Sequence, residues 1–251
     1  MTRRPAAVLL VLLLAACGAS SATRSPQAAP TTATTTIASS TTTTLTTTTT
    51  TIAPTTVATT VPAPPDRVLI EQDWVPFGVA VDVTLHYPSR RVERIGFHQS
   101  NNEGSRRIEP LDTGIPATTM DSRDRLSDPN SSADVVVDPE SDIRAPVSGT
   151  VVSSGSYRLY CDLYDYFLNI EPDDHPGWLV RVLHITGLSV GDGDRVEAGE
   201  TVIAPGARQL PLVSQVDELR TVDPAWPHVH IEVSDPSIPN VPNGGSGYEN
   251  C

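Results

Sequence analysis

The chain has 251 residues, of which 30 are Asp or Glu and 17 are Lys or Arg, so its formal net charge at pH 7 is −13. This acidic balance argues against nucleic acid or an anionic lipid surface as the partner, because both are negatively charged themselves. No lysine occurs in the sequence, which excludes any function that attaches a cofactor to a lysine side chain.

The N-terminus has the pattern of an export signal. Arg3 and Arg4 precede an apolar segment, residues 6–14, that is too short to span a bilayer comfortably. The Leu-Ala-Ala-Cys run that ends at Cys17 resembles the lipobox of bacterial lipoproteins. The resemblance implies a signal peptide over residues 1–16, lipid on Cys17, and attachment through that lipid to the outer face of the cytoplasmic membrane of a bacterium. An ordinary secretory signal is the alternative, and either signal exports the protein.

Residues 17–65 combine this predicted lipid anchor with a Thr/Pro-rich tether. From Ser20 to Pro65 nearly every residue is Thr, Ala, Pro or Ser, a composition that buries too little apolar surface to fold. An extended chain of this length reaches on the order of 100 Å. We therefore expect a disordered tether that places the rest of the chain within a cell wall above the membrane.

The remaining residues, 66–251, suffice for one well-buried domain. Short β-favouring runs between turn residues predict strands at residues 68–70, 79–85, 135–137, 150–152, 179–185, 202–204 and 229–233. No segment has the pattern of a long amphipathic helix. We predict an all-β class, a flattened barrel or sandwich of short antiparallel strands, with residues 66–111 as an N-terminal extension and residues 112–251 as the main domain.

The cysteines fit an exported protein. With Cys17 assigned to lipid, Cys161 and Cys251 remain as one possible pair in an oxidising compartment. A disulfide between them would close a loop of about 90 residues and stabilise the fold by roughly 4 to 5 kcal/mol in the chain-entropy model. Two separate free thiols are the alternative.

The most informative local pattern is Trp-Pro-His-Val-His-Ile-Glu-Val, residues 226–233. On a strand, His228 and His230 project to the same face, with Glu232 next in line, while the apolar residues between them face a core. Two parallel imidazoles suit metal ligation combined with proton transfer, since a neutral imidazole does either. A polar solvent face that carries two histidines is the alternative interpretation.

Two glycine-containing phrases, residues 144–152 and 190–202, indicate tight turns between short strands. The pair resembles the half-barrels, or duplicated hybrid motif, of two groups of proteins. One group contains biotinyl and lipoyl carriers with their membrane-fusion relatives; the other contains the LytM-type or lysostaphin-like zinc peptidoglycan endopeptidases. The absence of lysine excludes a carrier, while a structural module of an envelope transport assembly stays open.

The resemblance to the LytM-type endopeptidases covers about residues 120–235. That family has a HxxxD motif, an Ala-Pro before a glycine turn, a strand ending in histidine, a GD-V-GE phrase and a HxH motif. Here Asp134, the Ala-Pro at 145–146, His184, and the pair His228 and His230 follow in the same order. The resemblance implies that Asp134 and His230 are zinc ligands. It further implies that His184 and His228 orient or deprotonate the attacking water and stabilise the oxyanion.

One position departs from the family pattern. Asn130 stands four residues before Asp134, where the first ligand histidine should be, and zinc seldom chooses a neutral amide oxygen. Three alternatives are open: Asn130 or a nearby group is a poor ligand, another histidine replaces it, or the site is dead and the groove serves only in binding. His98 is the best replacement candidate, although its Asn/Ser-rich surroundings favour an ordinary surface histidine. With one ligand short, the sequence favours weak or absent metal.

Two main functions follow from these patterns. The first is zinc-dependent cleavage of peptidoglycan cross-bridge or stem peptides. The second is a catalytically silent relative that grips peptidoglycan or regulates a separate hydrolase. Arg123 and Arg125 are expected to flank the mouth of the groove, where arginine could match a peptide carboxylate. A solvated loop face is the preferred interpretation for both.

Overall fold

The computed structural model describes residues 67–159 and 163–240. The predicted signal peptide, the tether and Cys17 lie outside the described residues, and so do Cys161 and Cys251. Lipidation and the disulfide therefore stay predictions. In the described part of the chain, no helix is both long and apolar enough to cross a membrane.

The fold is all-β, as predicted from the sequence. Its one helical element within the described residues is a short 3-10 helix, η1 (Gln215–Leu219). The strands are β1 (Ile70–Glu71), β2 (Pro76–Ala80), β3 (Val83–His86), β4 (Arg91–His98), β5 (Glu109–Pro110), β6 (Ala117–Thr119), β7 (Ser132–Val137), β8 (Ile143–Arg144), β9 (Gly149–Leu159), β10 (Leu163–Pro172), β11 (Leu179–Ile185), β12 (Arg195–Val196), β13 (Val202–Ala204) and β14 (His228–Ser234).

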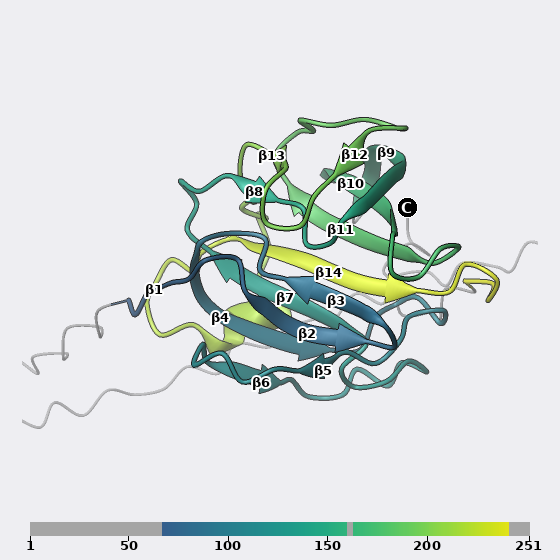
Figure 1. The fold of residues 1–251 in the computed structure, drawn as a ribbon. Coiled ribbons are helices and arrows are strands. Elements are labelled where there is room, and N and C mark those ends of the chain that lie inside the picture. Colours follow the sequence, from purple (N-terminus) through teal and green to yellow (C-terminus); the bar gives the residue numbers. More distant parts are fainter. Residues whose placement is uncertain (1–66, 160–162, 241–251) are drawn as a thin grey trace, which may run out of the picture. The chain divides into compact units, whose positions relative to one another are not determined.

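The main sheet has nine strands. Eight of them are hydrogen-bonded in the order β1-β4-β7-β14-β11-β10-β9-β12 with antiparallel neighbours, and β6 joins β4 in parallel (Figure 1). Strand β4 comes from the segment predicted as an N-terminal extension, yet it pairs with β7 from Val92 to His98. Residues on both sides of position 111 therefore build one continuous sheet.

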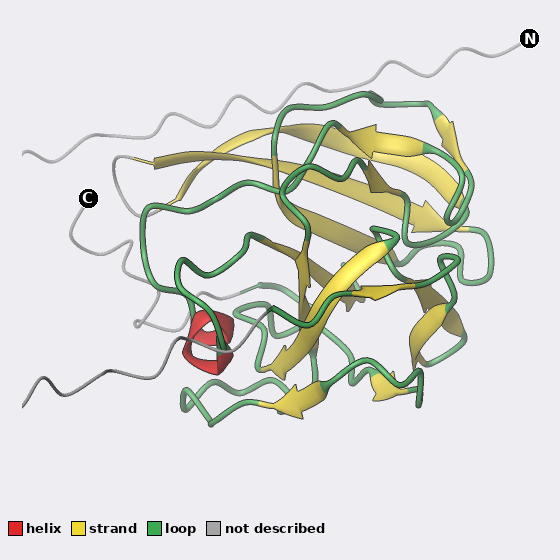
Figure 2. Cartoon of the chain, turned by 90° about the vertical axis from the view of Figure 1, so that its left-hand side faces the viewer, coloured by secondary structure: helices red, strands yellow, loops and turns green. Residues whose placement is uncertain are grey.

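Alternation along the strands gives this sheet an apolar face. Val229, Ile231 and Val233 on β14 are fully buried in the main core. The two smaller sheets, β13-β8 and β3-β2-β5, add further side chains to the same core, among them Ile143, Ile203, Phe77 and Leu85. Figure 2 shows the described chain as strands joined by loops, with one short helix. The opposite face of the main sheet is free to carry polar residues.

The predicted strand limits are correct for β11 and β13 and wrong for residues 79–85. That run forms two strands, because Val81 turns the chain with a φ of 56° between β2 and β3. Strand β4 is missing from the predicted set, since Arg91, Glu93 and Arg94 interrupt its apolar pattern. Glu93 is nonetheless buried, because it accepts a hydrogen bond of 2.5 Å from Arg67.

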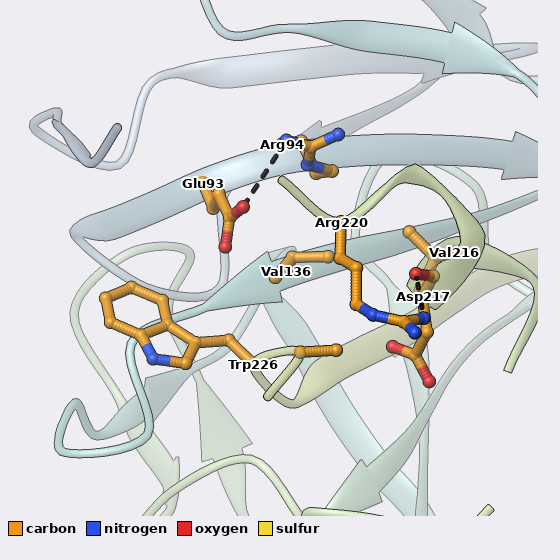
Figure 3. A pocket seen from close by; sticks show the side chains of 8 residues that line it. Glu93, Arg94, Val136, Val216, Asp217, Arg220 and Trp226 are labelled. Carbon is orange, nitrogen blue, oxygen red and sulfur yellow. Dashed lines mark hydrogen bonds and ion pairs between the residues drawn. The ribbon is translucent and has the colours of Figure 1, made fainter. Parts of the chain in front are cut away.

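A small cavity of about 10 Å³ lies beneath η1, between Arg94, Val136, Val216 and Trp226 (Figure 3). Arg94 donates a hydrogen bond to the carbonyl oxygen of Leu219 and so fastens η1 to β4. A volume of this size is at the lower limit for holding one water molecule. This cavity is a packing feature rather than a ligand site.

Gly149→Ala is expected to destabilise the protein by about 1–3 kcal/mol or more. A Cβ at Gly149 would lie 2.2 Å from the carbonyl oxygen of Glu171, so the paired strands β9 and β10 would have to separate. Chemical denaturation measures the free energy of unfolding. Gly191→Ala is the matched control, since its Cβ would meet nothing within 4 Å; equal stability of both variants would contradict the close approach.

Candidate metal centre

Three neighbouring strands place polar side chains on the face opposite the core. His230 on β14 projects there, and Asp134 on β7 is its direct partner in the ladder. On the other side of β7, strand β4 sets His98 opposite Ser132, which is two residues from Asp134. His98 therefore lies diagonally beside Asp134, within reach of its carboxylate.

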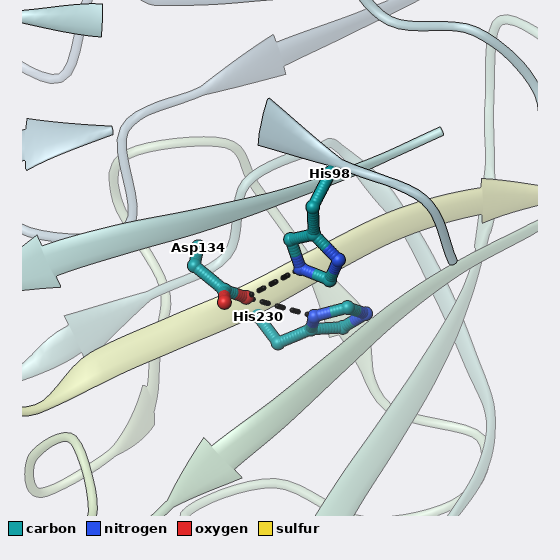
Figure 4. A group of neighbouring side chains, drawn as sticks. All are labelled: His98, Asp134 and His230. Atoms are coloured by element: carbon teal, nitrogen blue, oxygen red, sulfur yellow. Dashed lines mark hydrogen bonds and ion pairs between the residues drawn. The ribbon is translucent and has the colours of Figure 1, made fainter. Parts of the chain in front are cut away.

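His98, Asp134 and His230 form one buried group (Figure 4). His98 Nε2 lies 3.1 Å and His230 Nδ1 2.9 Å from the same oxygen, Asp134 Oδ1. One potential ligand atom from each residue lies within 4.8 Å of the other two. The group could hold a metal ion.

The surroundings of His98 fit a ligand. Its Nδ1 lies 3.0 Å from the carbonyl oxygen of Gln99, which can only accept, so a proton on Nδ1 would complete this hydrogen bond. The hydroxyl of Ser132 donates to the carbonyl oxygen of His98 and contacts the ring at 3.1 Å. If the ring is neutral with its proton on Nδ1, the lone pair of Nε2 points at Asp134 Oδ1. Both atoms are then hydrogen-bond acceptors, and neither carries a proton to share. A cation between them, a metal ion or a second proton, resolves this contact.

His230 has a supporting carboxylate on its other side. With Nδ1 directed at Asp134, its Nε2 lies 3.6 Å from Glu232 Oε2. Glu232 is buried and accepts hydrogen bonds from Ser100 and, at 3.2 Å, from Ser105. Such outer partners fix the orientation and basicity of a ligand imidazole.

Electrostatics couple these residues. Burial raises the pKa of Asp134, but His98, His228 and His230 outweigh it and hold that pKa well below its ordinary value. Burial lowers the pKa of His230, yet hydrogen bonds to Asp134 and Glu232 raise it to about 9. Burial also dominates at His228, whose pKa falls to about 4. Asp134 is thus a carboxylate that requires a nearby cation, which a bound metal would supply in place of protons.

Asn130 stands outside the metal-binding group. Its side-chain oxygen accepts a hydrogen bond of 2.8 Å from Thr119, and its backbone N–H donates to Asp128. The third member of the metal-binding group is therefore His98 from β4 rather than the amide of Asn130. The preference for an ordinary surface histidine at position 98 is wrong, because only 7% of the His98 side chain is exposed.

The two histidines assigned to proton transfer lie beside the metal-binding group. His228 Nε2 lies 3.7 Å from Asp134 Oδ2, and the ring of His228 is 5.0 Å from that of His184, centroid to centroid. The rings of His184 and His230 are 5.9 Å apart. All four site residues predicted from the sequence, Asp134, His184, His228 and His230, thus gather in one place.

His184 reaches the site through a bulge in β11. Leu183 pairs with Phe167 and Ile185 with Tyr166, so His184 is left without a partner, and its φ is 64°. Regular alternation would send His184 to the core, because Leu183 already faces the polar side opposite His230. The extra residue turns both side chains toward the same cleft.

Asp165 on β10 is a site residue that the sequence analysis missed. Its Oδ2 lies 2.6 Å from His184 Nδ1 and also accepts a hydrogen bond of 2.8 Å from Tyr157. The carboxylate is completely buried. A single acidic residue within an aromatic run, Leu-Tyr-Asp-Tyr-Phe, is the signal that could have identified it.

The histidines open into a cleft of about 1150 Å³. Its floor is the polar face of the sheet, including Ser153, Asn169 and Arg181, while Leu210, Leu212, Val213 and the segment 123–125 form parts of its walls. Arg123 and Arg125 are both among the residues that line the cleft. A volume of this size accommodates an extended peptide of a few residues.

Comparisons of the chain with protein-family models, with curated proteins and with solved structures find no match. The resemblance to the LytM-type endopeptidases therefore depends on the residues named above and on their order along the chain.

Proposed function

We propose that this protein is a zinc-dependent endopeptidase that cleaves peptidoglycan peptides. The observation that carries the proposal is the position of His98, which supplies the third strong donor that the sequence motif lacks. It completes a His-Asp-His set beside two further histidines in a peptide-sized cleft.

Zinc is the metal that the donors favour. Two imidazole nitrogens and one carboxylate oxygen form a common ligand set for catalytic zinc, which keeps one position open. Tetrahedral bonds of the usual zinc lengths place neighbouring donors about 3.3 Å apart. The contacts of 3.1 and 2.9 Å to Asp134 Oδ1 are close to that spacing.

When bound, zinc would polarise the scissile carbonyl and lower the pKa of a water molecule to about 7. The protein's own contribution is to hold the peptide in the cleft and to place His184 and His228 beside the metal-binding group. One of these imidazoles accepts a proton from the attacking water, and the other donates a hydrogen bond to the developing oxyanion.

Two features of the sequence support the proposal that the protein acts at the cell wall. The lipobox-like run ending at Cys17 and the Thr/Pro-rich segment up to residue 65 together favour an exported domain held at a distance from the membrane. Peptidoglycan is the peptide-bearing polymer at that location. The silent relative and the transport module remain the alternatives that an activity test separates.

Purified mature protein is expected to release new amino groups from isolated peptidoglycan, with a rate that a zinc chelator abolishes and added zinc restores. Mass spectrometry of the released fragments identifies the bond that is cut. His230→Ala is the matched inactive control. Zinc-loaded protein that binds peptidoglycan without any cleavage would contradict the enzyme proposal and support the silent relative.

A further inference from the structure

Asp165 and His184 form a carboxylate–imidazole pair that the sequence motif does not include. The two atoms in contact, Asp165 Oδ2 and His184 Nδ1, are 2.6 Å apart, and a carboxylate in this contact accepts the proton of the ring. The backbone N–H of His184 donates to the same oxygen at 3.2 Å. Both the ring and the main chain of His184 are therefore tied to Asp165.

We propose that Asp165 is a positioning residue that holds His184 in the tautomer protonated at Nδ1, with the lone pair of Nε2 available in the cleft. This inference rests on the proposed function, because it assigns the proton-accepting role to His184. Among the described residues, no carboxylate lies as close to His228 as Asp165 does to His184; His228 Nε2 is 3.7 Å from Asp134, which belongs to the metal-binding group.

The bulge in β11 independently supports this role. A non-glycine residue with a positive φ is uncommon, and such residues concentrate at functional sites. His184 adopts a φ of 64° and interrupts the hydrogen-bond ladder between β10 and β11. This irregular backbone brings the His184 ring to Asp165. Simple core packing would not require this conformation.

The hydrogen bonding of Asp165 points the same way. Oδ2 accepts bonds from His184 and Tyr157, whereas Oδ1 is buried with no hydrogen-bond partner among the described residues. Burial raises the pKa of Asp165, but its hydrogen bond to His184 and the nearby imidazole charge hold that pKa below the ordinary value. A buried carboxylate with one unsatisfied oxygen reduces stability, which is typical of a group retained for function.

With this tautomer, every proton transferred during hydrolysis has a donor and an acceptor. As the water oxygen forms its bond to the carbonyl carbon, His184 Nε2 accepts one of its protons, and Asp165 stabilises the resulting imidazolium. The same proton passes to the amide nitrogen as the carbon–nitrogen bond breaks, and the new carboxylic acid releases its proton to solvent. Among the described residues, the titratable side chains beside His184 in this step include Asp165, His228 and His230.

Nitrogen NMR of the mature protein labelled with ¹⁵N-histidine tests the tautomer directly and needs no substrate. In its neutral form, His184 is expected to show a protonated Nδ1 and an unprotonated Nε2. The spectrum of His184→Gln assigns the signals. In Asp165→Asn the Nδ1–H form should lose its preference, because an amide can donate to Nδ1 as well as accept from it.

Kinetics provide the second measurement. Asp165→Asn is expected to lower kcat by about 10²-fold or more with little change in KM and with unchanged zinc content, since general-base catalysis contributes about 10²–10⁴-fold. Tyr157→Phe keeps the carboxylate and should keep the Nδ1–H tautomer. Asp173→Asn, an exposed Asp paired with Arg195, is the matched control and should leave both readouts unchanged.

The inference is overturned if wild-type His184 is protonated at Nε2, or if Asp165→Asn retains the Nδ1–H tautomer and the wild-type kcat. Absence of peptide hydrolysis in the wild type would refute the proposed function instead. In that case the spectrum alone would decide whether Asp165 sets the tautomer.

Discussion

His98→Ala is expected to lower the affinity for zinc by more than about 100-fold. Losing an outer-shell partner of a metal ligand typically costs 10–100-fold in affinity, and loss of a ligand itself should cost more. His98 contributes a nitrogen 3.1 Å from Asp134 Oδ1, and without it only Asp134 and His230 remain as ligands. Competition with a chromophoric chelator measures the change in affinity.

Two variants make this result specific to His98. His175→Ala removes a histidine that packs edge-on against Trp178 outside the metal-binding group, so zinc affinity should not change. Asn130→Ala should also retain zinc, because the amide of Asn130 is engaged by Thr119. Loss of zinc from Asn130→Ala combined with full binding by His98→Ala would show that the ligands are assigned wrongly.

His184→Ala and His228→Ala are each expected to lower kcat by about 10²–10⁴-fold while zinc binding is retained. Neither histidine belongs to the His-Asp-His group, but both line the cleft next to it. Removing either one leaves the metal in place and takes away a proton acceptor or an oxyanion donor. Initial rates on a peptidoglycan peptide, with zinc measured in the same samples, test this expectation.

The zinc measurement separates a chemical role from a structural one. A variant that loses both zinc and activity would indicate that the histidine supports the metal-binding group. Wild-type rates in both variants, with zinc bound, would remove His184 and His228 from the reaction and leave the cleft without an identified proton acceptor.

The strand that carries the HxH motif can be predicted from the sequence, because polar and apolar residues alternate along its whole length. His228, His230 and Glu232 face the cleft, while Val229 and Ile231 are fully buried on the other side. Strands with apolar or β-branched runs, such as residues 179–185, were predicted for the same reason. Asp134, His184, His228 and His230 are predicted from the resemblance in motif order, and the structure brings their side chains together.

Two residues could not be assigned reliably because their placement depends on non-local pairing. His98 is 36 positions from Asp134 in the sequence, and only the β4–β7 register brings them together. The strand that ends at His98 is not predicted, because the charged residues Arg91, Glu93 and Arg94 interrupt its apolar pattern. Asp165 reaches His184 through a bulge, and no periodic pattern reveals an interruption of this kind.

Elemental zinc analysis of purified wild-type protein, after dialysis against metal-free buffer, tests the central claim most directly. A third donor at His98 predicts about one zinc per chain, because the site then has the three protein ligands of a catalytic zinc centre. Zinc well below one equivalent, with no gain when zinc is added back to the folded protein, would contradict the account and leave the cleft as a binding surface without a metal.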